Sequence, residues 1–532
     1  MSRAQTLSKL AQGLVYDGTS NLTVGSITVG RGAGSVSTNT AVGASALAAN
    51  TTGSSNTAVG LSALSFNTTG TTNSAFGLFA LRSNTTGSNN TAVGEEALWQ
   101  NTTASNNTAL GYQAGYSNLV GADNVYLGHQ AGYASTDNNN TFSGARAGRY
   151  TTTGANITAV GYVALNSNTT GSNNTALGSQ ALISNTTGLN NTAVGYQAAY
   201  SNTAGIFNVA MGYQAGYSNT TATGNIFFGH QAGFSFNSAG SITNTSGNIV
   251  IGMQAGYALT TGSANVIIGS NNSTYTNPAG YGLTSGNVNT FIGCGAGQSA
   301  TTGSGNTFIG TGSGGSVTTG ASNTILGRYN GFQGGLDIRT SNNYIVLSDG
   351  DGNPQIAART GRSVSLEGAV PQIGTGITFP ATQNPSSNAN TLDDYEEGTW
   401  TPILTASSPP TGVTYNAQGG TYTKVGRMVT IVAGLNIAST GSGGSGELRV
   451  SGLPFAAIAA GAFQEARNVV GAGNLNNAAN AGKAEMFAAS GSTYLSGRVN
   501  DNSDTVWNYS DLKGGSLSTG SFIKITLTYF TN

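Results

Sequence analysis

The stretch "NTTGSNNTAVG", residues 84–94, returns as "NTTGSNNTALG" at 168–178 and as "NTTGLNNTAVG" at 185–195. A catalytic site occurs once in a chain, so a motif that occurs three times indicates a structural role. The glycine that ends the phrase recurs along more than half of the chain. These register glycines are Gly43, Gly60, Gly77, Gly94, Gly111, Gly128, Gly144, Gly161, Gly178, Gly195, Gly212, Gly229, Gly252, Gly269, Gly293, Gly310 and Gly327. Thirteen of the sixteen intervals between them are 17 residues long, and a short fixed period is typical of a solenoid.

Each unit reads "N-T-A-V-G-Y-Q-A-L/G-x-S-N-T-T-G-S-N". The segments "TAVG" and "YQAL" both alternate polar and apolar residues, which predicts two short strands, and "SNTTGS" is a cluster of turn-forming residues. A unit of this length is too short for a helical repeat with its own turns. We therefore expect a parallel β-solenoid with a thin core of Ala and Val, whose coils stack about 4.8 Å apart. Matching Asn and Thr side chains would then hydrogen-bond along the stack.

The amino-acid composition argues against several classes of function. The chain has 532 residues, 81 glycines, 7% charged residues and a formal net charge of −1. These values provide no electrostatic surface for nucleic acid or anionic lipid. No apolar run approaches the roughly 20 residues that span a bilayer, and residues 1–18 lack the apolar core of a secretory signal. We expect a soluble protein without membrane insertion, nucleic-acid partner or cofactor. A single cysteine, Cys294, leaves no intrachain disulfide.

The runs "NTAVGASAL", "NTALGYQAG" and "NTAVGYQAA" resemble the head repeats of trimeric autotransporter adhesins, and similar repeats are common in phage tail fibres. The resemblance covers about residues 35–330. It implies a left-handed parallel β-roll formed by three chains, although the 17-residue unit is longer than the usual adhesin unit. On this basis we assign residues 35–335 to a β-solenoid shaft and expect a homotrimer.

Residues 1–34 form a separate N-terminal segment. The pattern "SRAQTLSKLAQGLV" places Leu7, Leu10, Leu14 and Val15 on one face of a predicted amphipathic helix. This segment is interpreted either as a virion-attachment peg or coiled-coil nucleus, or as a simple end cap of the rod.

The composition changes after Gly327, since 14 of the 19 acidic residues lie between Asp337 and Asp511. Residues 336–390 are predicted to form a β-hairpin neck and a linker rich in Pro, Ser and Asn. Residues 391–532 contain β-runs separated by Gly/Ser turns, which predicts an antiparallel β-sandwich tip. The phrases "ITFPATQ…TLDDYEEGTWTP" and "GTYTKVGRMV" resemble the distal C-terminal module of many tailed-phage fibres.

Catalytic and metal-binding patterns are weak. Polysaccharide-cleaving spikes use paired carboxylates, but between residues 31 and 330 the shaft carries only Glu95, Glu96, Asp123 and Asp137. The acidic group Asp393, Asp394, Glu396 and Glu397 around Tyr395 is interpreted as a solvated neck, with Ca²⁺ binding as the alternative. "DGDGN" at 349–353 imitates an EF-hand start but lacks the required sixth and twelfth residues, so a hairpin turn is expected there.

Histidine and tyrosine recur directly after the register glycine, and a second series of tyrosines ends the phrases "AGY" and "AAY". His129 and His230 both occupy the position after the register glycine, where a trimer would form three-fold rings able to hold a metal or anion, although a structural role is favoured. Cys294 occupies it too, and we expect it to pack as a small apolar residue. Tyrosines form two series, interpreted as ladders stacked on one another rather than sugar-binding platforms. The series are Tyr112, Tyr162, Tyr196 and Tyr213, and Tyr116, Tyr133, Tyr200, Tyr217 and Tyr257.

The non-repetitive tip is the expected recognition region. Its prominent aromatics are Trp400, Tyr422, Trp507 and Tyr509. A core role is favoured for Trp400, so the segment "DTVWNYS" is the preferred receptor-binding loop.

Together these features favour a phage fibre or spike, assembled in the host cytoplasm and incorporated into the virion. Its N-terminus would attach to a tail or capsid protein, and its tip would bind a host surface glycan or outer-membrane receptor without catalysis. A bacterial surface adhesin is the alternative, disfavoured because neither a signal peptide nor a membrane anchor is recognisable. A polysaccharide depolymerase is disfavoured by the few carboxylates.

Overall fold

The computed structural model describes residues 14–16, 22–24, 27–237, 247–271, 277–360, 364–366, 370–371, 377–378, 395–456, 471–472, 474–476, 484–488, 494–499 and 521–531. The chain divides into two compact units, Met1–Thr378 and Phe379–Asn532. The first contains the shaft and the second contains the tip. Among these described residues there is no α-helix, and η1 (Ala33–Ser35) is a single 3-10 turn. The described part also contains no helix that is long and apolar enough to cross a membrane.

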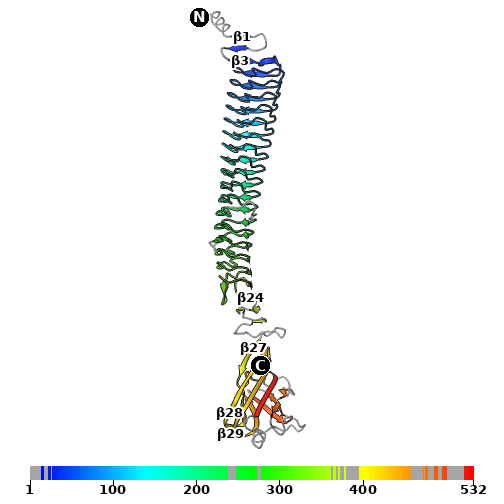
Figure 1. Ribbon diagram of the computed structural model, residues 1–532, viewed down its shortest axis with the longest axis vertical. Helices are drawn as coiled ribbons and strands as arrows, with labels where there is room; N and C mark the ends of the chain where they lie inside the picture. Colours follow the sequence, from blue (N-terminus) through cyan, green and yellow to red (C-terminus); the bar gives the residue numbers. More distant parts are fainter. Residues whose placement is uncertain are drawn as a thin grey trace. The chain divides into compact units, whose positions relative to one another are not determined.

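The shaft is a stack of three-residue strands, one in each coil, and each strand pairs in parallel with that of the next coil (Figure 1). The strands are β4 (Thr40–Val42), β5 (Thr57–Val59), β6 (Ser74–Phe76), β7 (Thr91–Val93), β8 (Thr108–Leu110), β9 (Val125–Leu127), β10 (Thr141–Ser143), β11 (Thr158–Val160), β12 (Thr175–Leu177), β13 (Thr192–Val194), β14 (Val209–Met211), β15 (Ile226–Phe228), β16 (Ile249–Ile251), β17 (Val266–Ile268), β18 (Thr290–Ile292), β19 (Thr307–Ile309) and β20 (Thr324–Leu326). Equivalent residues lie opposite one another, as Ala159 and Ala176 do. The predicted parallel β-solenoid is confirmed.

The second predicted strand of each coil, at "YQAL", is wrong. These residues form a turn in the coils from Gly43 to Gly252 and in those of Gly293 and Gly310, where the second residue after the register glycine has a positive φ, for example 54° at Gln113. Where the fourth residue is leucine it is left-handed as well, with a φ of 51° at Leu64. Left-handed residues curl the chain into a corner. The corner still bonds to its neighbours, since the Leu64 amide donates to the Ala80 carbonyl at 3.0 Å.

Two facing columns of side chains fill the coils. The strand-centre column is the middle residue of each strand, and the turn column is the fourth residue after the register glycine, or its equivalent. Both are buried throughout. Where the strand centre is alanine, as at Ala58, the turn column often holds leucine, as at Leu64. Each aromatic ring of the strand-centre column, such as that of Phe227, faces a glycine of the turn column. The predicted alanines are in the core, but the valine of each "TAV" strand is not, and leucine, isoleucine or aromatic side chains fill the remaining volume.

Two columns of buried asparagines join successive coils. The first precedes the strands: the Asn73 amide donates to Asn56 Oδ1 at 3.0 Å, and Asn73 Nδ2 donates to the Gly87 carbonyl at 2.8 Å. The second lies in the "NTT" turns, where Asn185 Nδ2 donates to Asn168 Oδ1 at 2.8 Å. Each amide therefore finds its partner one coil away, which confirms the predicted hydrogen bonding along the stack and explains the repeated phrase.

The register glycines cannot carry side chains. Gly178 has a φ of 140°, and a Cβ there would lie 2.4 Å from the carbonyl oxygen of Gly195 in the next coil. Backbone of one coil thus contacts backbone of the next at this corner.

Antiparallel strands cover both ends of the stack. At the first coil, β1 (Leu14–Tyr16), β2 (Leu22–Val24) and β3 (Ile27–Gly30) form a meander whose last strand pairs with β4. Leu14 and Val15 therefore lie in a strand, and the helix predicted to include them is wrong at these two positions. The remainder of that prediction, with Leu7 and Leu10, lies outside the described residues.

At the other end the parallel ladder continues past residue 335, the expected end of the shaft. There β23 (Tyr344–Ser348) pairs with β20 in parallel, and β24 (Pro354–Arg359) pairs with β23 in antiparallel. The connecting "DGDGN" forms the predicted hairpin turn, in which Asp349 Oδ1 accepts bonds from the backbone amides of Asp351 and Asn353. The short strands β25 (Val364–Leu366) and β26 (Ile377–Thr378) follow.

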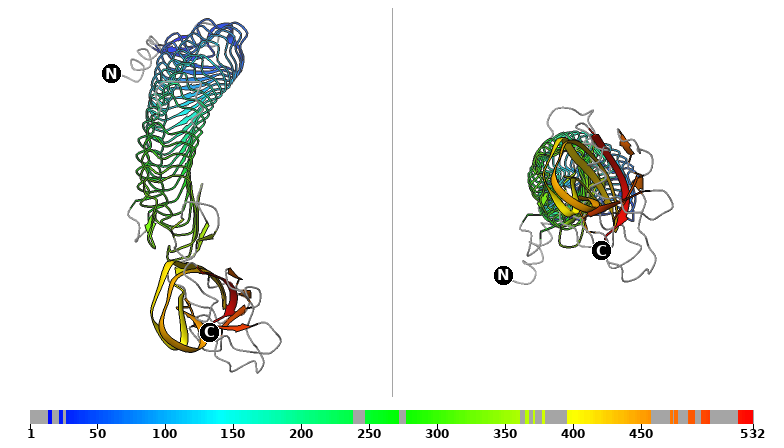
Figure 2. Two further views of the ribbon diagram at one scale, coloured as in Figure 1. Left: turned by 60° about the horizontal axis from the view of Figure 1, so that its bottom comes forward. Right: turned by 90° about the horizontal axis from the view of Figure 1, so that it is seen from below.

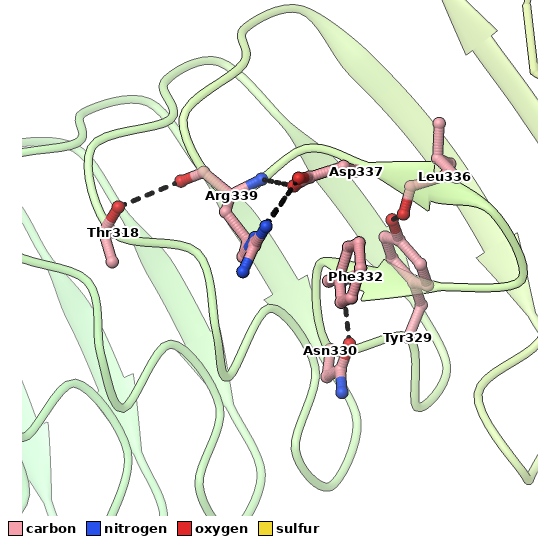
Figure 3. Close-up of polar contacts among 7 residues, drawn as sticks. All are labelled: Thr318, Tyr329, Asn330, Phe332, Leu336, Asp337 and Arg339. Carbon is pink, nitrogen blue, oxygen red and sulfur yellow. Dashed lines mark hydrogen bonds and ion pairs between the residues drawn. The ribbon is translucent and has the colours of Figure 1, made fainter.

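A small hairpin closes the core beside β20. It consists of β21 (Phe332–Gln333) and β22 (Leu336–Asp337). Figure 3 shows the buried Tyr329 donating its hydroxyl to the Leu336 carbonyl at 2.7 Å. In the same view Arg339 forms an ion pair with Asp337 at 2.8 Å, and its carbonyl accepts a bond from Thr318.

The predicted antiparallel pairing of the tip is confirmed, and the described tip strands belong to one sheet rather than to the two separate sheets of a sandwich. The strands are β27 (Tyr395–Trp400), β28 (Ile403–Val425), β29 (Met428–Ser451), β30 (Gly471–Ala472), β31 (Asn474–Asn476), β32 (Ala484–Ala488), β33 (Tyr494–Val499) and β34 (Ser521–Phe530). They pair in the order β27-β28-β29-β33-β32-β30, while β34 joins β29 to β31, and the sheet is curved (Figure 2). Alternate residues of β29, from Val429 to Ile437, are buried on one face.

Candidate functional site

The tip has an aromatic and charged cluster on the same sheet face as the buried Trp400. Cross-strand register in β27 and β28 sets Glu396 opposite Lys424 and Gly398 opposite Tyr422. A Cβ at Gly398 would lie 2.6 Å from the Tyr422 ring, so glycine makes room for that ring. Phe455, which follows β29, packs edge-on against Tyr422 with ring centroids 5.3 Å apart. We call Glu396, Tyr422, Lys424 and Phe455 the tip cluster.

Hydrogen bonding fixes the polar groups of the tip cluster. The Tyr422 hydroxyl donates to Glu396 Oε1 at 2.9 Å. Partial burial, and then this bond and the negative charge of Glu396, raise the pKa of the Tyr422 phenol. The phenol therefore stays protonated at neutral pH and holds the carboxylate in place. Lys424 Nζ lies 5.2 Å from the centre of the Phe455 ring, within the range of a cation–π contact.

This arrangement combines the exposed carboxylate of Glu396 with the half-buried rings of Tyr422 and Phe455 in one small region, while the Lys424 side chain is buried. Such a set suits a ligand that has both hydroxyls and apolar C–H faces. Sequence reasoning selected Tyr422 but missed Glu396 as its partner and Phe455 as its neighbour. The cross-strand register that joins them is not visible in a local pattern.

The other candidate binding residues of the tip are either buried in its core or lie outside the described residues. Trp400 is 7% exposed and packs over Gly420, so it belongs to the core, the role favoured for it. Its burial removes it as a binding platform. Trp507 and Tyr509 lie outside the described residues.

The acidic group at the tip entrance is only partly described, because Asp393 and Asp394 fall outside the described residues. Tyr395 donates its hydroxyl to Glu397, while Glu396 accepts from Tyr422. Within the described ranges no three His, Cys, Asp or Glu side chains gather closely enough to hold a metal ion. Whether the full acidic group binds Ca²⁺ stays a prediction to be tested.

The shaft carries two aromatic ladders, which confirms the stacking predicted for the tyrosines except at Tyr162, whose equivalents in the adjacent coils are Ala145 and Ser179. One occupies the fifth position after the register glycine, with ring centroids 4.9–5.4 Å apart. Its members are Trp99, Tyr116 and Tyr133, and then Tyr200, Tyr217, Phe234, Tyr257 and Tyr281. The second directly follows the register glycine, where Tyr196, Tyr213 and His230 stack at 5.4 and 5.0 Å. The rings cover one another's faces, and their edges point to solvent.

The two histidines lie in the second ladder. His129 stacks on Tyr112 at 5.4 Å and His230 on Tyr213, and both are exposed. Cys294 occupies the equivalent position in a later coil, is half-buried, and has a thiol pKa that burial raises. A raised pKa keeps the thiol protonated, which agrees with packing rather than with reactivity.

Shaft carboxylates take part in ladders of their own. Glu96 Oε2 accepts a bond from Gln113 Nε2 at 2.7 Å, and Gln130 in turn donates to Gln113. Asp123 accepts from Asn106 at 3.0 Å. These carboxylates thus stand in for amides in the column of polar side chains.

Comparisons with known proteins show no family. The chain matches no family model, and no curated protein matches it. Among solved structures, the crystal structure of the Dettilon tailspike protein is similar at 11% sequence identity, over 81% of this chain and 88% of that chain. The TM-score is 0.23, which is too low for this likeness to support a shared fold.

Proposed function

We propose that this chain is a fibre or spike protein of a tailed phage, a virion component that binds the host surface through its tip. The observation that carries the proposal is the contrast between its two units. The shaft pairs its buried amides with copies of themselves, whereas the tip presents a non-repetitive sheet with the tip cluster at one end. The phrases of shaft and tip that resemble phage fibres support it independently.

The proposed ligand is a host surface glycan, alone or on an outer-membrane receptor. Hydroxyl-rich sugars match the exposed Glu396 carboxylate, and sugar C–H faces match aromatic edges. Single sugar sites are usually weak, so several tips on one particle would raise the avidity. The remaining partners are a tail or capsid protein at the N-terminal segment and two further copies of the chain.

The chain acts by binding rather than by catalysis in this proposal. Support comes from Glu96 and Asp123, which already serve as hydrogen-bond acceptors in the shaft ladders.

The test combines location with binding. Antibodies against the full-length chain should label filaments that project from the phage particles encoding it. The purified full-length chain should compete with those particles for adsorption to host cells. Label on the bacterial envelope instead of the particle would favour the adhesin alternative and overturn the proposal.

Matched variants locate the binding region. Replacing Trp507 and Tyr509 with Ala should abolish competition if "DTVWNYS" is the site, and Tyr422→Ala should do so if the tip cluster is the site. Replacing the half-buried shaft residues Tyr200 and Tyr217, which belong to the ladder at the fifth position after the register glycine, with Ala is the control and should leave competition unchanged. Loss of competition only in the shaft variant would transfer recognition to the aromatic ladders.

A further inference from the structure

An apolar stripe runs along the outer face of the whole strand stack. The third residue of each strand points outward, and we call these residues the outer column. Its members are Val42, Val59, Phe76, Val93, Leu110, Leu127, Ser143, Val160, Leu177, Val194, Met211, Phe228, Ile251, Ile268, Ile292, Ile309, Leu326 and Leu347. Every member except Ser143 is apolar. None is buried, and Leu110 and Phe228 are 52% and 49% exposed.

The columns on either side extend this face. On one side lies the first residue of each strand, which is Thr or Ser in most coils and Val or Ile elsewhere, as at the exposed Ile226 and Ile345. On the other side lies the residue after the register glycine, with exposed Leu61 and Tyr162. The outer column and the strand-start column contain no charged residue. Alternation within a half-buried strand normally places polar residues on the solvent face, so this pattern is unusual for a surface.

The size of the stripe is that of a protein interface. Eighteen rungs spaced about 4.8 Å apart give a length of about 85 Å, and a width of about 10 Å gives about 850 Å². Soluble monomers rarely expose continuous apolar patches above a few hundred Å². Stable complexes bury about 800 Å² on each partner, so the stripe alone has enough area for one.

We propose that the outer column is the face through which three copies of this chain pack in parallel along the shaft. The inference deepens the proposed function by naming the surface on which its trimer rests. Uncharged, apolar side chains repeated at the coil spacing fit an identical stripe that has the same spacing.

Three copies can use the whole face, because the outer column lies between a flank that is mostly Thr and Ser and a flank of mixed composition, which includes Tyr162 and the charged Glu95 and Arg328. Around a three-fold axis each chain contacts two neighbours through different surfaces. The outer column would face the axis, the strand-start column one neighbour, and the column after the register glycine the other. All three shafts run in the same direction.

The first experiment measures the mass of the full-length chain by light scattering. The test variant carries Leu110→Lys, Leu177→Lys and Phe228→Lys in the outer column. The control carries Thr103→Lys, Thr170→Lys and Thr187→Lys, at exposed positions of the "NTT" turns. Both add three positive charges to the shaft surface. Parent and control should have three times the 53.2 kDa chain mass, and the test variant a single chain mass with unchanged circular dichroism.

Several results would overturn the proposal. A parent of one or two chain masses would exclude the three-fold assembly. A test variant that stays trimeric, or a control that dissociates equally, would show that the outer column is not the interface. None of these readouts involves host binding, so they are independent of the adsorption test.

Cross-linking provides a second test of the proposal if the lysine variant of the outer column does not fold. In a Cys294→Ser background, Leu177→Cys places one thiol in the outer column, and Thr187→Cys places one in a turn. A short bismaleimide reagent should link chains of the first variant into a two-chain band on a denaturing gel and leave the second unlinked. Equal linking of the two, or none in the first, would contradict the proposed face.

Discussion

Gly216 of one coil lies against the ring of Phe227 in the next coil, where a Cβ on the glycine would be 2.6 Å from Cδ2 of the phenylalanine. The same facing positions hold Leu182 and Ala193 two coils earlier, and both of these are buried. A large side chain in the strand-centre column is therefore matched by a small residue in the turn column, and the reverse, so that each coil is filled without overlap. Close packing of this kind makes the identity of each residue dependent on its partner.

The first prediction tests this exchange of volume. Phe227→Ala should destabilise the shaft by about 3–5 kcal/mol because it leaves a cavity, and Gly216→Leu should destabilise it because the new side chain overlaps the ring. The double variant recreates the pair formed by Leu182 and Ala193, and leucine is tolerated at the left-handed position, since Leu182 has a φ of 49°. Chemical denaturation should show the double variant to be more stable than the sum of the single effects implies.

The reverse exchange, Leu182→Gly with Ala193→Phe, provides the matched control for that cycle. It should show a coupling of the same sign. Additive effects in both cycles would mean that the two columns do not compensate each other.

The second prediction concerns the asparagine column in the "NTT" turns. Asn185→Ala removes bonds from Nδ2 to Asn168 and to the Gly188 carbonyl, and it removes one of the two acceptors of Asn202 Nδ2. Each buried polar group left without a partner costs about 1–3 kcal/mol, so the loss should be about 2 kcal/mol or more. Thr187→Ala, at an exposed position of the same turn, should have little effect. Equal midpoints of denaturation for the two variants would contradict a stabilising amide column.

The third prediction concerns the equivalence of coils. Deletion of residues 158–174 removes one coil and brings Ala176 to the place of Ala159, with the same neighbours. The chain should stay soluble, keep its circular dichroism, and shorten by about 4.8 Å in X-ray scattering. Deletion of residues 158–165 alone breaks the register and should cause aggregation. Similar behaviour of the two deletions would argue against independent coils.

The fourth prediction is a pH dependence in the tip. Burial raises the pKa of the Tyr529 phenol to about 12, against a smaller opposite effect of its bond to the Phe455 carbonyl. The unfolded chain releases this proton near pH 10, before the folded chain does. The stabilisation from Tyr529 is therefore complete below pH 10 and is lost as pH rises through about 12.

The corresponding measurement compares the parent with Tyr529→Phe across alkaline pH. The stability advantage of the parent, measured by denaturation, should shrink between pH 10 and 12. Tyr200→Phe, on the shaft, is the control. A constant difference between parent and Tyr529→Phe would show that the phenol ionises equally in both states.

The repeat alone determined the coil length, the parallel register and the asparagine columns. In a solenoid the partner of each residue lies one coil away and is usually the same residue, so a local phrase also describes the long-range contact. The register glycines, such as Gly178, marked the corner of each coil in the sequence for the same reason. At that corner the backbone of one coil contacts the backbone of the next.

Tertiary structure decided what the repeat could not encode. Alternation in "YQAL" suggested a strand, but left-handed residues such as Gln113 and Leu64 made it a turn, since alternation does not report φ. The pairing of Tyr422 with Glu396 depends on a cross-strand register 26 residues apart, in a unit without repeats. The apolar outer column also required the fold, because Leu177 and Ala176 look alike as apolar neighbours until the strand sends one into the core and the other to solvent.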